Sequence, residues 1–271
     1  MLIQLFAQIG VRIAVVEMQR ISRRIRLDKL LVERGLAASR ERAQALVLAG
    51  KILVNDQKVE KAGAAVDPAA ELRILGEDLK YVSRGGVKLE HALAHWHINM
   101  GDRVCMDVGA STGGFTDCLL QHGASRVIAI DTGYGQIAHR LRQDPRVRLL
   151  ERTNARYLKP EDVGEPVDFV ALDVSFISAT LVLPAVIRAA RAAKHGRLEV
   201  VILVKPQFEA GRQAVGKGGI VRDPKAQAEA VEKVRHTAIE LGAVHAESID
   251  SPILGAEGNR EFLLHAVFEN F

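Results

Sequence analysis

A turn of small residues between a predicted strand and a predicted helix is the first place where this sequence could do chemistry. Residues Asp107 to Phe115 read D-V-G-A-S-T-G-G-F and follow an apolar segment. Small residues let the backbone approach a ligand, and in a doubly wound sheet ligands bind at the carboxyl end of the first strand. A dinucleotide-binding fingerprint places glycine at its first, third and sixth positions. Here Ser111 holds the third position and Gly114 the sixth, so the match is incomplete.

Two acidic residues suggest which ligand the turn accepts. Asp107 stands just before the turn, where a carboxylate suits a ligand with a cationic amino-acid end. Asp131 closes the next predicted strand, where a carboxylate can bind ribose hydroxyls. S-adenosylmethionine carries both groups. An ordinary tight turn between strand and helix is the alternative.

Four further polar residues form a second candidate group: Lys88, Asp173, Lys205 and Glu261. Lys205 follows the apolar run 200–204, and Asp173 follows the run 168–172. Because the carboxyl ends of neighbouring parallel strands meet at one crevice, we expect these side chains to lie together there. Each of them alone is equally typical of a solvated strand end.

The elements that must position these residues alternate along the chain beyond residue 80. Strands are predicted over 104–108, 127–131, 147–150, 167–174 and 200–204, with final segments around 244 and over 262–267. Helices are predicted after 115, near 137, over 178–193 and after 224. Such alternation is typical of an α/β fold with parallel strands.

The region before residue 80 has a different character. From Arg20 to Lys61 there are eleven Lys or Arg against five Asp or Glu, a local excess of +6 in a chain whose net charge is +4. Helices are predicted over 27–35 and 40–49, followed by a hairpin that turns at 55–56. Such a basic module favours nucleic-acid binding, although a solvated helical face is the alternative. The candidate RNA-binding residues are Arg26, Lys29, Arg40, Arg42, Lys51, Lys58 and, beyond the module, Arg84.

Composition and the first residues restrict the class of protein. Cys105 and Cys118 are too few for a disulfide framework, which favours a reducing cytoplasm. The apolar segment 1–16 lacks a basic start and falls short of the roughly 20 residues that span a membrane, so export is not expected. Translation from Met18 is an alternative start. We expect an extension over 1–24, an RNA-binding domain over 25–80, a catalytic domain over 81–271, and no metal.

Seven stretches together resemble a known family: R-L-D from 26, S-R-G-G-V-K-L from 83, 109–115, E-R-T-N-A-R from 151, D-V-S-F-I-S from 173, V-K-P-Q-F-E from 204 and G-N-R-E from 258. From about Arg26 onward, the chain resembles the TlyA-type (haemolysin A-like) ribosomal RNA methyltransferases. The resemblance implies a Rossmann-like, S-adenosylmethionine-dependent methyltransferase fold of the FtsJ type. It implies a mostly parallel seven-stranded sheet with its last strand antiparallel, preceded by a small α+β RNA-binding domain like that of ribosomal protein S four.

The resemblance also implies an activity and a site. The activity is methylation of a ribose 2′-hydroxyl, that of a cytidine, in the RNA of ribosomal subunits. The family's Lys-Asp-Lys-Glu set falls on Lys88, Asp173, Lys205 and Glu261, with Glu257 as the alternative for the last. The candidate cofactor residues are Asp107, Gly109, Ser111, Thr112, Gly113, Gly114, Phe115, Asp131, Asn154 and Asp173.

The chemistry assigns roles to the four polar residues. Methyl transfer from a sulfonium is an in-line displacement, so geometry supplies most of the gain, and the alcohol must also lose a proton. We expect Lys205 to be the base or the group that orients the oxygen, and Lys88 to be its cationic neighbour. Asp173 and Glu261 then keep the two cations in register.

The alternative functions for the whole protein are a dehydrogenase, an inactive RNA-binding ribosome-assembly factor, and a pore-forming haemolysin.

Overall fold

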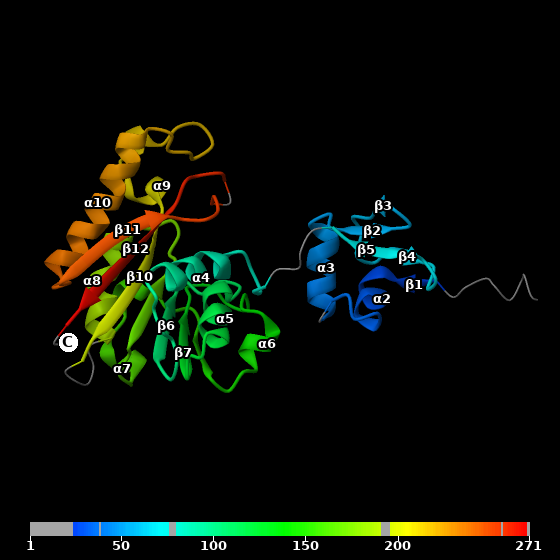
Figure 1. Cartoon of the computed structure of the whole chain (residues 1–271), viewed down its shortest axis with the longest axis horizontal. Helices are drawn as coiled ribbons and strands as arrows, with labels where there is room; N and C mark the ends of the chain where they lie inside the picture. The colour runs from blue at the N-terminus through cyan, green and yellow to red at the C-terminus, as the bar shows by residue number, and fades with distance from the viewer. Residues whose placement is uncertain (1–23, 38, 76–79, 191–195, 256, 270–271) are drawn as a thin grey trace, which may run out of the picture. The chain divides into compact units, whose positions relative to one another are not determined.

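The computed structural model describes residues 24–37, 39–75, 80–190, 196–255 and 257–269 (Figure 1). The chain divides into two compact units, one up to Asp78 and the other from Leu79 onward. The expected extension lies outside the described residues except for Arg24, and the alternative start at Met18 lies outside them too.

The first unit is a small α+β domain. Two helices, α2 (Leu27–Glu33) and α3 (Arg40–Leu48), pack with short antiparallel strands. The strands are β1 (Ile25–Arg26), β2 (Ile52–Val54), β3 (Gln57–Lys58), β4 (Ala65–Val66) and β5 (Leu72–Ile74). Ser39 caps α3, because its Oγ accepts a hydrogen bond from the backbone N–H of Arg42. Both turn residues between β2 and β3, Asn55 and Asp56, have positive φ, as a tight two-residue hairpin needs.

The second unit is built on a seven-stranded sheet in the order β11-β12-β10-β9-β6-β7-β8. Among these described strands, only β12 runs antiparallel to its neighbours, β10 and β11, and the other pairings are parallel. The strands are β6 (Val104–Val108), β7 (Arg126–Ile130), β8 (Val147–Leu150), β9 (Phe169–Leu172), β10 (Leu198–Val204), β11 (His245–Asp250) and β12 (Phe262–Phe268). This is the predicted topology, with the last strand antiparallel.

Helices cover both faces of this sheet (Figure 1). They are α4 (Gly85–His95), α5 (Gly114–Gln121), α6 (His139–Arg142), α7 (Pro160–Val163), α8 (Ala179–Ala190), α9 (Pro206–Glu209) and α10 (Pro224–Glu240), with short 3-10 turns at Ala155–Tyr157 and Arg212–Ala214. Successive strand residues point to opposite faces, so Cys105 packs beneath α4, α5 and α6 while Met106 packs beneath α7, α8 and α10. Both faces are therefore buried, as a parallel sheet requires.

Some predicted boundaries were wrong. The strand predicted over 167–174 is observed only over Phe169–Leu172, because the chain leaves the sheet after Leu172 and carries Asp173 to the crevice. The helix predicted near 137 is the short α6. Among the described residues, no helix has the length and apolar character needed to cross a membrane.

Candidate functional site

Two cavities adjoin at the carboxyl edge of the central strands. The larger has a volume of about 570 Å³ and the smaller about 310 Å³. Residues from the ends of β6 and β9 line both cavities: Gly109, Ser111, Asp173, Ser175 and Phe176. A molecule in one cavity therefore borders a molecule in the other.

The predicted small-residue turn brings β6 and β9 together at this edge. A Cβ atom on Gly109 would lie 2.2 Å from the backbone oxygen of Asp173, so only glycine fits there. Gly109 also has a φ of 91°, which favours glycine. Ser111, Thr112, Gly114 and Phe115, which the sequence assigned to the cofactor, line the larger cavity, and of these four only Ser111 also lines the smaller one.

Asp131 lies in the wall of the smaller cavity and joins two loops. Its Oδ2 accepts a hydrogen bond from the Ser111 N–H at 2.7 Å, and its Oδ1 accepts one from the Gly133 N–H at 2.6 Å. Each carboxylate oxygen has a second lone pair, which leaves acceptor capacity for hydroxyl groups. Asn154 lines the same cavity.

Of the predicted cofactor residues, Asp107 and Gly113 line neither of these two cavities. Asp107 is fully buried, and its Oδ2 accepts hydrogen bonds from the Thr116 N–H and hydroxyl at 2.8 and 2.6 Å. Its Oδ1 is buried with no hydrogen-bond partner among the described residues. Burial raises the pKa of Asp107 to about 7. Asp107 thus ties β6 to the first turn of α5, whereas Gly113 leaves room for Leu141.

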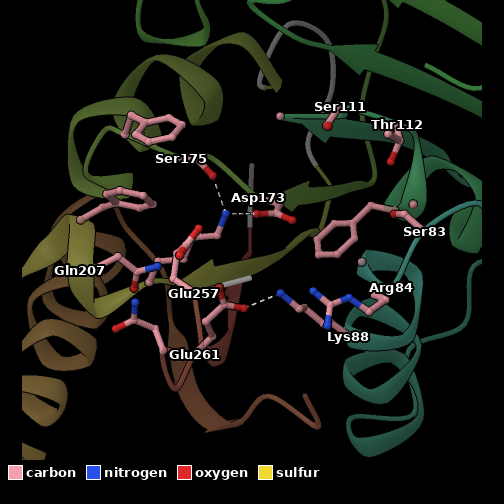
Figure 2. Close-up of a pocket in the computed structure, with 18 of the residues that line it drawn as sticks. Ser83, Arg84, Lys88, Ser111, Thr112, Asp173, Ser175, Gln207, Glu257 and Glu261 are labelled. Atoms are coloured by element: carbon pink, nitrogen blue, oxygen red, sulfur yellow. Dashed lines mark hydrogen bonds and ion pairs between the residues drawn. The ribbon is translucent and has the colours of Figure 1, made fainter. Parts of the chain in front are cut away.

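The four polar residues predicted from the sequence surround the larger cavity as two ion pairs (Figure 2). The Nζ atom of Lys205 lies 2.5 Å from Asp173 Oδ1, and Lys88 pairs with Glu261. Both lysines are only 9% exposed. Each lysine therefore has a carboxylate partner of its own, Asp173 for Lys205 and Glu261 for Lys88.

The structure separates the two candidates for the last position of this set. Glu261 precedes β12, is 4% exposed and holds Lys88. Glu257 also lines the larger cavity, but it is exposed and makes none of these ion pairs. The geometry thus favours Glu261.

Sequence reasoning missed an aromatic pair and four polar residues of the larger cavity. Phe176 is 92% exposed and its φ of 64° is unusual for a bulky side chain, so its loop holds it in a strained conformation. The centre of its ring lies 5.3 Å from that of Phe208. The polar residues are Ser83, Ser175, Gln207 and Asn259. Phe176 and Ile177 stand between Ser175 and Ser178 just after a buried strand, where no regular spacing marks the residues that face the cavity.

The predicted RNA-binding residues are divided between the two units. Arg26 and Arg40 both bind the buried carboxylate of Asp28, which also accepts a hydrogen bond from Gln44. The hydrogen bond from Arg26 holds the pKa of Asp28 well below its usual range. More than half of each arginine side chain remains exposed.

The other candidate RNA-binding residues lie on several different elements and do not share a partner such as Asp28 in the ion pairs described here. Lys29 and Lys58 pair with Glu33 and Glu60 at the surface, at 3.6 and 3.5 Å. Arg42 lies in α3, Lys51 precedes β2, and Arg84 belongs to the second unit, where it lines the larger cavity just before α4.

Comparison with known proteins identifies both units. Residues 81–268 match the model of the FtsJ-like methyltransferases. The chain belongs to this family. Residues 25–72 match the S4 domain, so the second unit is called the methyltransferase unit and the first the S4 unit below. Membership in a methyltransferase family favours transfer of a methyl group over the dehydrogenase alternative.

Several relatives align with almost the whole chain. The 16S/23S rRNA (cytidine-2'-O)-methyltransferase TlyA of Mycobacterium tuberculosis is 46% identical over 244 residues, which cover 90% of each chain. Hemolysin A of Brachyspira hyodysenteriae is 39% identical over 245 residues, 90% of this chain and all of that one. A solved structure from Streptococcus thermophilus, provisionally named a hemolysin, is 42% identical with a TM-score of 0.68 and covers 91% of this chain and 89% of its own.

Proposed function

We propose that this protein uses S-adenosylmethionine to methylate the 2′-hydroxyl of a cytidine in ribosomal RNA. The observation that carries the proposal is the pair of cavities that adjoin at Asp173, with Lys205 beside it. A relative that is 46% identical over 90% of the chain bears the name of an rRNA (cytidine-2'-O)-methyltransferase.

The smaller cavity suits the methyl donor. Asp131 offers carboxylate oxygens to ribose hydroxyls, and the glycine at 109 lets the backbone approach a ligand closely. When bound, S-adenosylmethionine supplies an activated methyl group on a positively charged sulfur. Since the cavities share the ends of β6 and β9, a donor in the smaller cavity borders an acceptor in the larger one.

The larger cavity suits a nucleotide. Lys205 contacts the attacking ribose oxygen, either orienting it or accepting its proton, while Asp173 fixes the lysine. The Lys88–Glu261 pair forms part of the same wall and preserves its shape and charge. The exposed Phe176 and the partly buried Phe208 offer aromatic surface on which a base can stack. Most of the rate gain then comes from holding the oxygen in line with the methyl group.

The S4 unit serves to dock the enzyme on folded RNA. Its exposed arginines and lysines neutralise phosphates, which supplies affinity without base specificity. A ribosomal substrate places the protein in the cytoplasm, in contact with ribosomal subunits.

Mapping of 2′-O-methylation in ribosomal RNA, with and without this protein, tests the proposal. Cytidine sites should lose their methyl group when the protein is absent and regain it when purified protein and S-adenosylmethionine are added to the unmodified subunits. An identical methylation map in both samples contradicts the proposal. Tight RNA binding without methyl transfer would instead support an inactive assembly factor.

A further inference from the structure

Ser175 stands next to the central lysine of the proposed reaction. We infer that Ser175 is a positioning residue for methyl transfer, because its hydroxyl fixes the amino group of Lys205 against the ribose oxygen. The inference rests on the proposed function and adds a fifth residue to the Lys-Asp-Lys-Glu set.

The contacts of Lys205 define what Ser175 does. Lys205 Nζ donates a hydrogen bond to Ser175 Oγ at 2.8 Å and lies 2.5 Å from Asp173 Oδ1 (Figure 2). An ammonium group carries three N–H bonds, whose directions change by rotation about the Cε–Nζ bond. An ion pair with Asp173 alone leaves that rotation open, whereas the hydrogen bond to Ser175 fixes one N–H bond and with it the directions of the other two.

The third direction at the nitrogen is the one that matters for chemistry. Lys205 lines the larger cavity. Asp173 and Ser175 occupy two of the three hydrogen-bonding directions at its Nζ atom, so the third direction is available to an atom in that cavity. In the charged lysine this side is an N–H that orients the ribose oxygen. In the neutral lysine it is a lone pair that accepts the hydroxyl proton. Ser175 serves both roles in the same way, because it fixes the direction.

The loop that carries Ser175 is itself held firmly. Glu209 is 6% exposed and accepts hydrogen bonds from the hydroxyl of Ser178 at 2.5 Å and the N–H of Ala179 at 2.6 Å. Lys233 of α10 donates to the backbone oxygen of Glu209 at 3.1 Å. The loop after β9 is thus tied to the segment after β10 that carries Lys205. A hydroxyl placed on such a braced loop can hold the lysine at a defined angle.

Ser175 also lines the smaller cavity, which gives a competing explanation. If the hydroxyl bound the methyl donor, its loss would weaken S-adenosylmethionine binding. If it positions Lys205, its loss slows the chemical step and leaves donor affinity unchanged. The two roles therefore separate by measurement.

The test compares the full-length wild type with Ser175→Ala and Ser175→Thr. Single-turnover methylation of unmodified ribosomal subunits is measured at saturating S-adenosylmethionine, and the dissociation constant of S-adenosylmethionine is measured by calorimetry. We expect Ser175→Ala to slow the single-turnover rate at least about tenfold with a dissociation constant within about twofold of wild type. Ser175→Thr, which keeps the hydroxyl, should recover most of the rate.

Ser125→Ala is the control, because it removes a hydroxyl that binds the backbone oxygens of Asp102 and Arg103 and lines neither cavity. It should lower the melting temperature and keep the single-turnover rate. A wild-type rate in Ser175→Ala overturns the inference, as does an equal loss of rate in Ser125→Ala or a loss explained by weaker donor binding. If the wild type itself methylates no cytidine, the proposed function fails. That outcome is distinguishable from a failure of the inference about Ser175, in which the wild type is active.

Discussion

Lys88 and Glu261 stand 173 residues apart in the sequence and form a buried ion pair that joins α4 to the start of β12. Their side chains are 11% and 4% exposed, so neither charge is well solvated by itself. The pair thus links the first helix of the methyltransferase unit to its last strand, directly in the wall of the larger cavity.

Variants of this ion pair should show that its effect on the free energy of unfolding can be separated from its effect on methyl transfer. Glu261→Gln leaves the Lys88 charge buried without its partner, which we expect to cost about 3 kcal/mol of unfolding free energy. The double variant Lys88→Met/Glu261→Leu removes both charges and should regain most of that stability. Both variants should lose methyl transfer. Unfolding in urea can be followed by the fluorescence of Trp96, the sole tryptophan of the chain, which lies in the methyltransferase unit. Equal instability of the two variants would contradict this explanation.

Lys205→Ala should keep the fold and RNA binding and lose most methyl transfer, because the lysine acts on the attacking oxygen and not in ground-state binding. Lys205→Arg should be nearly as inactive if the lysine is a base, since guanidinium keeps its proton. Partial activity of Lys205→Arg would indicate an orienting role. Single-turnover methylation under saturating cofactor and RNA is the measurement, and a wild-type rate in Lys205→Ala would remove Lys205 from the catalytic set.

The sheet could be predicted from the sequence because the inner strands are largely apolar, and β7, β9 and β10 are each followed by a polar residue of the crevice: Asp131, Asp173 and Lys205. Asp173 and Lys205 were found for this reason, since strand ends alone place them together. The pairing of Lys88 with Glu261 could not be deduced from spacing, because it depends on how α4 packs against the last strand. The resemblance to a family supplied that grouping.

Other features depend on side-chain burial, which the sequence does not report. Asp107 has the residue type and position of a ligand contact, yet its carboxylate turns inward to Thr116. Ser175 and Phe176 lie in a loop without regular periodicity, so no pattern marks which of them faces the cavity.

Asp131→Ala should weaken S-adenosylmethionine binding. It removes a charge-assisted hydrogen bond to ribose, about 1.5 to 3 kcal/mol, which raises the dissociation constant at least about tenfold. Asp168→Ala is a matched control, because Asp168 also accepts a backbone hydrogen bond, from Val104 at 2.9 Å, yet lines neither cavity. Calorimetry should show wild-type affinity for the control. Wild-type affinity in Asp131→Ala would refute the assignment.

Replacing Arg40, Arg42 and Lys51 with Ala should weaken RNA binding and flatten its salt dependence. For every phosphate that the variant no longer neutralises, the slope of log affinity against log salt should fall by about 1. Arg40→Ala leaves Arg26 and Gln44 on Asp28, so the S4 unit should stay folded.

The control is a second triple variant, in which three basic residues of the methyltransferase unit are replaced with Ala: Arg126, Lys225 and Arg235. It changes the net charge by the same amount as the S4 variant. RNA affinity is measured by filter binding at several salt concentrations. The slope of log affinity against log salt should be closer to that of the wild type for this control than for the S4 variant. If both triple variants flatten the slope equally, the RNA contact is not localised to the S4 unit.

The buried carboxyl of Asp107 predicts a pH dependence of stability. Because burial raises its pKa from 3.8 to about 7, the folded protein retains a proton that the unfolded chain has released between those two values. Asp107 therefore makes the fold less stable as pH rises from about 4 to about 7, by up to roughly 4 kcal/mol. Asp107→Asn keeps an acceptor for Thr116 and cannot ionise. Its stability relative to wild type should thus increase with pH across this window and level off above it. Urea unfolding of both proteins at several pH values, followed by Trp96 fluorescence, measures this difference, and parallel pH profiles would show that Asp107 stays ionised in the folded protein.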